Sequence, residues 1–302
     1  TWDRSLQFNS RPGNGQPELL ADLVGSSCYE AISDDATKDE DNAGWILELT
    51  PSVRAEWIER IRWIRLVDRL AEHELVCSGT DEFQKFVMDW QHLLTTGTVD
   101  QTQDYYDVLT QIQQRWFDKE GNPVDECSIQ AWNTYVCAIA RYHAADLVIE
   151  TFEQYEQMLL DLAGAFFQVL PFLSEHQRAA ACYFGIIDQF YNHLRDLQED
   201  AEKNICYLPT ELLNCFNVSR QEILQQRAQD NPNYYLMMQF WLSDYLPRLR
   251  RKARQLVNAD DLHESWQVLR EWSIHRYRRI EFFFRECEFD YTQFPRMYWA
   301  QV

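Results

Sequence analysis

Two acidic residues four positions apart, Asp196 and Asp200, form the part of the sequence best suited to chemistry. On a helix, residues at this spacing emerge from one face about one turn apart, so both carboxylates could hold divalent cations between them. Gln189 and Asn192 precede them at helical spacing and extend the polar line. A solvated helix surface can carry the same pattern, so this pair alone leaves both interpretations open.

A second acidic pair, Asp68 and Glu72, follows Arg65 in a stretch that is otherwise mostly apolar. Two such pairs on two largely apolar helices suggest facing walls around a central cavity, although two surface salt-bridge networks remain the alternative. Mg²⁺ suits these walls because it takes oxygen ligands and shares them with substrate phosphates. A diphosphate could then be held through Mg²⁺, with Arg195 or Lys203 completing the neutralisation.

The overall composition narrows the choice of partners. The 302 residues carry a formal net charge of −20, which argues against a nucleic-acid partner. The eight cysteines are scattered without zinc spacing, which predicts reduced thiols in a cytoplasmic protein. The longest apolar run, residues 162–173, is too short to span a bilayer. We expect a soluble protein whose apolar and aromatic content still allows peripheral contact with a membrane.

Helix-forming residues dominate the chain, and only 9 Gly and 9 Pro interrupt them, which predicts an all-α protein. Residues 1–302 show no repeat or composition shift and are expected to form a single domain. Residues 1–15 are expected to form a flexible arm, followed by a short helix near residues 17–24. The acid-rich segment 30–42 is expected to be a solvated loop. Further helices are predicted over residues 51–76, 81–95, 102–117, 128–143, 151–172, 174–201, 219–228, 233–257 and 260–286.

Residues 189–209 closely resemble the second aspartate-rich region of the squalene/phytoene synthase family. That region has the form Q-x-x-N-x-x-R-D-x-x-E-D-A, a short gap and then Y-L-P, and all of these residues occur here in register. The resemblance implies an all-α, isoprenoid-synthase-like single-domain bundle around a central cavity. It also implies metal, substrate or catalytic roles for Gln189, Asn192, Arg195, Asp196, Asp200 and Tyr207.

The resemblance continues more loosely in both directions. Residues 45–72 look like the first aspartate-rich region, so Asp68 and Glu72 are expected to bind metal and act in catalysis, with Arg65 on the substrate. Ala163 and Gly164 match the middle helix. Residues 276–296 resemble the closing helix, which implies substrate-binding roles for Tyr277 and Arg296.

Three departures from the family pattern concern the site. The family usually has Ser-x-Ser-Phe before the first region, where this chain has Asn-Ala-Gly-Trp at residues 42–45. Glu72 replaces the usual aspartate, and Phe166 and Phe167 stand where a glycine normally follows. Their bulk could shorten or close a prenyl-chain tunnel. Of the histidines, His193 is expected to be a structural neighbour, and the sequence suggests no partner for His143.

The resemblance implies an Mg²⁺-dependent prenyltransferase that joins two prenyl diphosphates head to head through a cyclopropyl intermediate. Farnesyl and geranylgeranyl substrates both remain open, and NADPH is expected only if the product is squalene. The altered first region leaves an alternative, in which a catalytically degenerate relative acts as a prenyl-lipid-binding or assembly protein. The oligomeric state cannot be inferred from the sequence.

Overall fold

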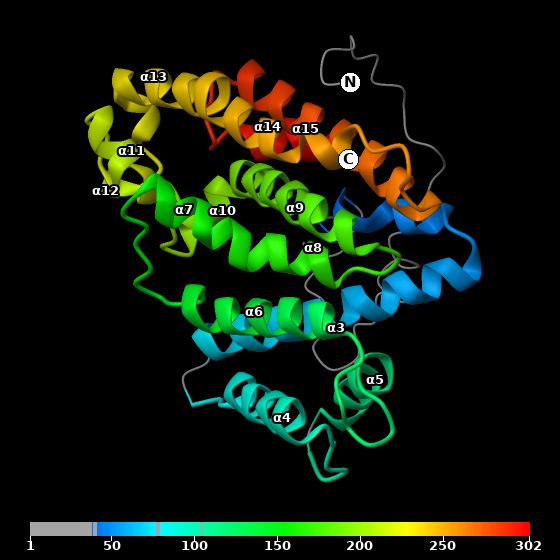
Figure 1. Ribbon diagram of the computed structural model, residues 1–302. Helices are drawn as coiled ribbons and strands as arrows, with labels where there is room; N and C mark the ends of the chain where they lie inside the picture. The colour runs from blue at the N-terminus through cyan, green and yellow to red at the C-terminus, as the bar shows by residue number, and fades with distance from the viewer. Residues whose placement is uncertain (1–37, 39–40, 77–78, 104) are drawn as a thin grey trace.

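The computed structural model describes residue 38 and residues 41–76, 79–103 and 105–302. The predicted arm over residues 1–15 and the short helix near residues 17–24 lie outside these ranges. Every regular element within them is helical, which confirms the predicted all-α class. With the labels of Figure 1, the elements are η1 (Gly44–Glu48), α3 (Pro51–Val76), α4 (Glu82–Thr96), α5 (Tyr106–Trp116), α6 (Glu126–Tyr142), α7 (Phe152–Leu159), η2 (Leu160–Gly164), α8 (Ala165–Val169), α9 (Glu175–Arg195), α10 (Leu197–Glu202), α11 (Thr210–Cys215), α12 (Arg220–Leu224), η3 (Ala228–Asp230), α13 (Pro232–Phe240), η4 (Trp241–Tyr245), α14 (Leu246–Val257), α15 (Glu264–Glu286) and α16 (Phe294–Trp299).

The helices form layers on both sides of α9 (Figure 1). One side of α9 packs against α14 and α15, and its other side packs against η2 and α8. The next layer contains α6 and α3, and α4 and α5 lie outermost. None of the described helices is both long and apolar enough to cross a bilayer.

Large aromatic side chains on α3 explain how the outer helices attach. Trp57 and Trp63 have no solvent exposure (0%), and burial of such rings is a main source of core stability. Trp63 meets Trp116 of α5 and Trp132 of α6 edge to face, with ring centroids 5.4 and 6.3 Å apart. The predicted bounds of this helix, residues 51–76, are confirmed.

Two of the predicted long helices contain a π-helical turn. The predicted helix over residues 151–172 includes η2, and the predicted helix over residues 233–257 includes η4. At η2 the backbone comes very close to α9. A Cβ added to Gly185 would lie only 2.4 Å from the Ala163 carbonyl oxygen. Glycine is therefore required at position 185 for η2 and α9 to pack together.

The helix predicted over residues 174–201 is interrupted at Asp196. Its backbone has φ −98° and ψ 7°, so α9 ends at Arg195 and α10 begins at Leu197. The Asp200 amide still donates to the Asp196 carbonyl oxygen at 2.9 Å. The two acidic residues thus keep the predicted one-turn separation although they belong to different elements.

A buried carboxylate attaches the segment before η1 to the centre of the molecule. Asp41 is 1% exposed, and its side chain accepts hydrogen bonds from Arg195 at 3.0 Å, Arg279 at 2.5 Å and Tyr298 at 2.7 Å. The expectation that residues 30–42 form a solvated acidic loop is therefore wrong at Asp41. Arginines from α9 and α15 supply the partners, and a short-range sequence pattern cannot reveal them.

We predict that Asp41→Asn lowers the free energy of unfolding by about 3–5 kcal/mol, because the substitution removes the buried negative charge that pairs with Arg195 and Arg279. Urea denaturation followed by circular dichroism measures the change. Asp260→Asn, on an exposed residue, is the control and should shift stability by no more than about 0.5 kcal/mol. An Asp41→Asn protein as stable as the control would show that the cluster does not hold this segment in place.

Candidate active site

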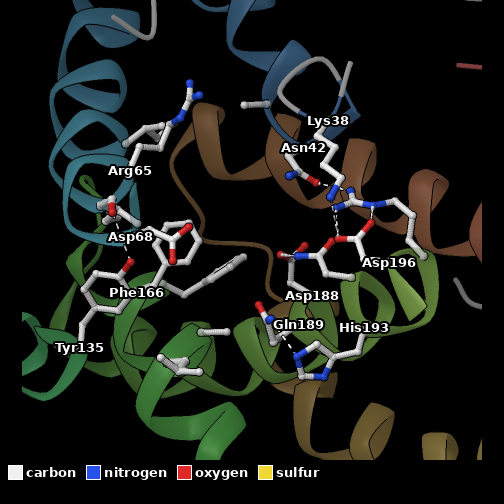
Figure 2. Close-up of a pocket in the computed structure, with 18 of the residues that line it drawn as sticks. Lys38, Asn42, Arg65, Asp68, Tyr135, Phe166, Asp188, Gln189, His193 and Asp196 are labelled. Carbon is white, nitrogen blue, oxygen red and sulfur yellow. Dashed lines mark hydrogen bonds and ion pairs between the residues drawn. The ribbon is translucent and has the colours of Figure 1, made fainter. Parts of the chain in front are cut away.

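A cavity of about 400 Å³ lies between α3, the η2–α8 segment and α9. Figure 2 shows Arg65 and Asp68 on one side, Gln189, His193 and Asp196 on the opposite side, and Phe166 projecting between them. Most of the predicted site residues line this cavity, namely Arg65, Asp68, Glu72, Phe166, Phe167, Gln189, Asn192, Arg195, Asp196, Asp200 and Tyr207.

The α3 wall carries Asp68 and Glu72, one helical turn apart. His143, which follows α6, faces them, with Nε2 3.3 Å from Asp68 Oδ1. One potential ligand atom from each of the three side chains lies within 4.8 Å of the others. Burial alone would lower the pKa of His143, but its hydrogen bond to Asp68 and the charges of Asp68 and Glu72 raise it overall.

The α9 wall is chemically different because protein cations already neutralise Asp196. Arg195 donates to both carboxylate oxygens of Asp196, from Nε and Nη2, each at 2.8 Å. Lys38 lies 3.6 Å from the same carboxylate and 2.5 Å from Glu199 (Figure 2). Burial opposes ionisation of Asp196, but Arg195 and Lys38 outweigh it and hold its pKa below the usual range.

Asp200 has the opposite electrostatic environment. Burial and the charge of Asp196 raise the pKa of Asp200 well above its ordinary value, and Lys38 and Lys203 offset only part of this. No side chain of the described residues forms an ion pair with its carboxylate. A divalent cation beside Asp200 would stabilise its ionised form, so its environment fits a metal ligand.

The two walls converge at Tyr207. Burial is the largest cause of the raised pKa of Tyr207, and the charges of Asp200, Asp68, Glu72 and Asp196 raise it further. The charges of carboxylates on both walls therefore raise the pKa of the same hydroxyl. This supports the hypothesis of facing acidic walls, which the sequence could offer only as one of two alternatives.

A histidine inside the second motif orients its neighbours. Gln189 Nε2 donates to His193 Nε2 at 3.0 Å, and His193 Nδ1 lies 3.0 Å from the Tyr155 hydroxyl. Burial lowers the pKa of His193 to about 3, so the ring is neutral and positions the Gln189 amide. The ring also stacks on Tyr207 at 4.3 Å. His193 therefore has the structural role expected from the sequence.

Asn192 belongs to a buried network rather than pointing freely into the cavity. Its Oδ1 accepts from Arg276 at 2.8 Å, and its Nδ2 donates to Asp188 at 3.2 Å. The Tyr277 hydroxyl donates to Asp188 at 2.5 Å, and Tyr277 itself has 0% exposure. Tyr277 therefore lies behind the cavity-lining residue Asp188. Arg296, in α16, is exposed and is absent from the cavity lining.

The remaining lining of the cavity is mostly apolar. Trp45 packs edge to face on Trp57 at 4.8 Å, and Trp57 contacts Trp266 at 5.3 Å. Phe167 joins the same cluster through Trp266 and is 3% exposed, whereas Phe166 is only partly buried. The predicted bulk at these two positions thus belongs to the cavity wall, and this surface suits an apolar ligand.

The sequence interpretation missed several charged or titratable side chains of the cavity, among them Lys38, His143 and Asp188. Lys38 was counted in the acidic loop, His143 had no visible partner, and Asp188 lies beside the predicted polar line. Asp68 and His143 are 75 positions apart, so their contact depends on how α6 packs on α3. Only the adjacency of Asp188 to Gln189 was a signal available in the sequence.

The donor set fits a hard divalent cation. Asp68 and Glu72 offer carboxylate oxygens on one wall, and Asp200 offers a carboxylate without an ion-pair partner among the described residues on the other. Asp196 and Asn192 could join only by sharing atoms that now accept from Arg195 and Arg276. The α3 wall and Asp200 are therefore the better-prepared candidates for binding such a cation.

Comparison with known proteins agrees with the sequence resemblance. A region of 105 residues is 39% identical to a 15-cis-phytoene synthase of Synechococcus elongatus. This match covers 33% of the present chain and 31% of that relative, so the chain spans about a third of the curated relative it matches. The fold is similar to the crystal structure of a dehydrosqualene synthase in complex with a ligand, with a TM-score of 0.63 and 14% identity over 86% of this chain and 91% of that one. The family model of squalene/phytoene synthase matches residues 37–281, and the chain therefore belongs to the squalene/phytoene synthase family.

Proposed function

We propose that the protein is a prenyltransferase that joins two prenyl diphosphates head to head through a cyclopropyl intermediate, with Mg²⁺ as cofactor. The observation that carries this proposal is the convergence of carboxylates from α3 and from α9–α10 on one cavity whose remaining lining is largely aromatic and aliphatic. Such a cavity matches the two halves of a prenyl diphosphate, since one half is a polyanion and the other a hydrocarbon.

In this proposal, each part of the lining has a separate task. When bound, Mg²⁺ neutralises the diphosphate and assists its departure. Asp68, Glu72 and Asp200 hold the cations, while Lys38 and Lys203 add positive charge at the edge of the diphosphate site. The rings of Trp57 and Phe166 exclude water from the carbocation and present their π faces to it.

The alternative, a non-catalytic prenyl-lipid-binding or assembly protein, is favoured by two specific observations. Arg195 and Lys38 already neutralise Asp196, and Asn42 accepts from Arg195 at 2.7 Å and from Arg276 at 2.8 Å where the family usually has hydroxyl groups. Both arrangements reduce the need for a metal on the α9 wall. Turnover assays separate the two functions.

The purified protein should convert farnesyl or geranylgeranyl diphosphate to a hydrocarbon with release of diphosphate, and only with Mg²⁺ present. Asp200→Asn should lower kcat at least about 100-fold, because charge stabilisation by a metal is worth several kcal/mol. The same substitution should raise the free energy of unfolding near pH 7. The folded-state pKa of Asp200 is raised, so its ionisation opposes folding above the unfolded-state pKa, and asparagine removes that opposition.

The control for this experiment is Asp260→Asn, which should leave both rate and stability unchanged. Product analysis and a diphosphate assay, run with urea denaturation on the same preparations, give the two readouts. If folded wild-type protein shows no Mg²⁺-dependent turnover with either substrate, the prenyltransferase function is rejected. The non-catalytic binding or assembly function then remains. Full activity in Asp200→Asn would show that the metal ligands lie elsewhere.

Phe166 should limit the length of the prenyl chain. We predict that Phe166→Ala raises the ratio of kcat/KM for geranylgeranyl over farnesyl diphosphate roughly tenfold, since each methylene in an apolar pocket is worth about 1–3 kcal/mol. Phe282→Ala, on a ring that is 40% exposed and outside the cavity lining, is the matched control. An unchanged ratio in Phe166→Ala would mean that this ring does not border the chain.

A further inference from the structure

The α3 wall holds a nitrogen donor that neither acidic motif contains. His143 ends α6 as its C-cap residue, and its backbone amide donates to the Ile139 carbonyl oxygen. Its side chain is 19% exposed and lines the cavity. The Nδ1 atom is buried and has no hydrogen-bond partner in the part of the chain that the structure describes. The end of α6 therefore places His143 beside the cavity, with Nε2 turned toward Asp68.

The spacing of the three donors fits one cation. Ligand atoms that bind the same metal at about 2.1 Å and at right angles lie roughly 3 Å apart. His143 Nε2 and Asp68 Oδ1 are 3.3 Å apart, and Glu72 brings all three donor atoms within 4.8 Å. The donors come from two elements, so they approach a common point from different directions, as ligands on one face of a metal do.

We propose that His143 is the third protein ligand of the cation on the α3 wall, together with Asp68 and Glu72. A cation at this point replaces the proton that the imidazole shares with Asp68, because imidazole ligates through a deprotonated nitrogen. This inference rests on the metal-dependent function proposed above, but it concerns binding and not turnover.

A nitrogen ligand changes which metals the wall prefers. Carboxylates alone suit Mg²⁺ and Mn²⁺, whereas imidazole strengthens binding of Co²⁺ and of later transition metals. On the α9 wall, both ring nitrogens of His193 already form hydrogen bonds, one with Gln189 and one with Tyr155. The preference for Co²⁺ over Mg²⁺ should therefore arise at the α3 wall.

The test uses the full chain without substrate. Co²⁺ binding is followed by isothermal titration calorimetry and by the visible d–d absorption, which reports nitrogen ligation, and Mg²⁺ is titrated in parallel. His143→Ala should weaken Co²⁺ binding at least about tenfold, the loss expected even for a group that only supports a ligand. Mg²⁺ binding should weaken less. His176→Ala is the matched control, because that histidine is 65% exposed, pairs with Asp261 and is not part of the cavity lining.

His143→Gln distinguishes a ligand from a partner that merely orients Asp68. The glutamine amide nitrogen takes the place of Nε2 and can still donate to Asp68, so an orienting role would be rescued, whereas the nitrogen signature of bound Co²⁺ would still be lost if His143 is a ligand. Unchanged Co²⁺ affinity and spectrum in folded His143→Ala would overturn the inference and leave an ion pair only. Prenyltransfer could then still occur with Mg²⁺. Conversely, the protein could bind Co²⁺ in a manner that depends on His143 and still show no turnover. That result would support His143 as a metal ligand and reject the proposed prenyltransferase activity.

Discussion

The buried Arg195 side chain is the interaction on which the rest of the site depends. It is 2% exposed and contacts its sequence neighbour Asp196 as well as Asp41 and Asn42, which lie more than 150 positions earlier. A buried guanidinium is tolerable only when carboxylates surround it, so these partners must be present together for the centre of the fold to form. The break between α9 and α10 occurs at Asp196, directly beside this guanidinium.

This constraint makes the two acidic walls unequal. At the C-terminal end of α9, Arg195 neutralises the charge of Asp196, whereas Asp68 and Glu72 line the cavity from the C-terminal part of α3 and face His143. The acidic pairs look equivalent in the sequence, because both are four residues apart. Their environments differ because Arg195 is preorganised by Asp41, a residue more than 150 positions earlier.

The sequence supports the helical class, the family and most of the candidate site residues because these depend on local composition and on a motif read in one stretch. The bounds of α3 follow from Thr50, Pro51 and a run without breakers. The burial of Asp41, the contact of His143 with Asp68 and the position of Lys38 depend on which helices pack together. The roles of Tyr277 and Arg296 were predicted from the loosest part of the resemblance, and neither side chain reaches the cavity lining.

The π-helical turn η2 has a consequence for how the shape of this cavity can change in evolution. It inserts one residue into the helix that precedes Phe166, and each residue of an α-helix rotates the following side chains by about 100°. Deleting one residue from η2 would thus relax the turn to an ordinary helix and swing Phe166 away from its present direction. A single-codon deletion could reshape the hydrocarbon end of the cavity in one step, without substituting any residue of the acidic walls on α3 and α9.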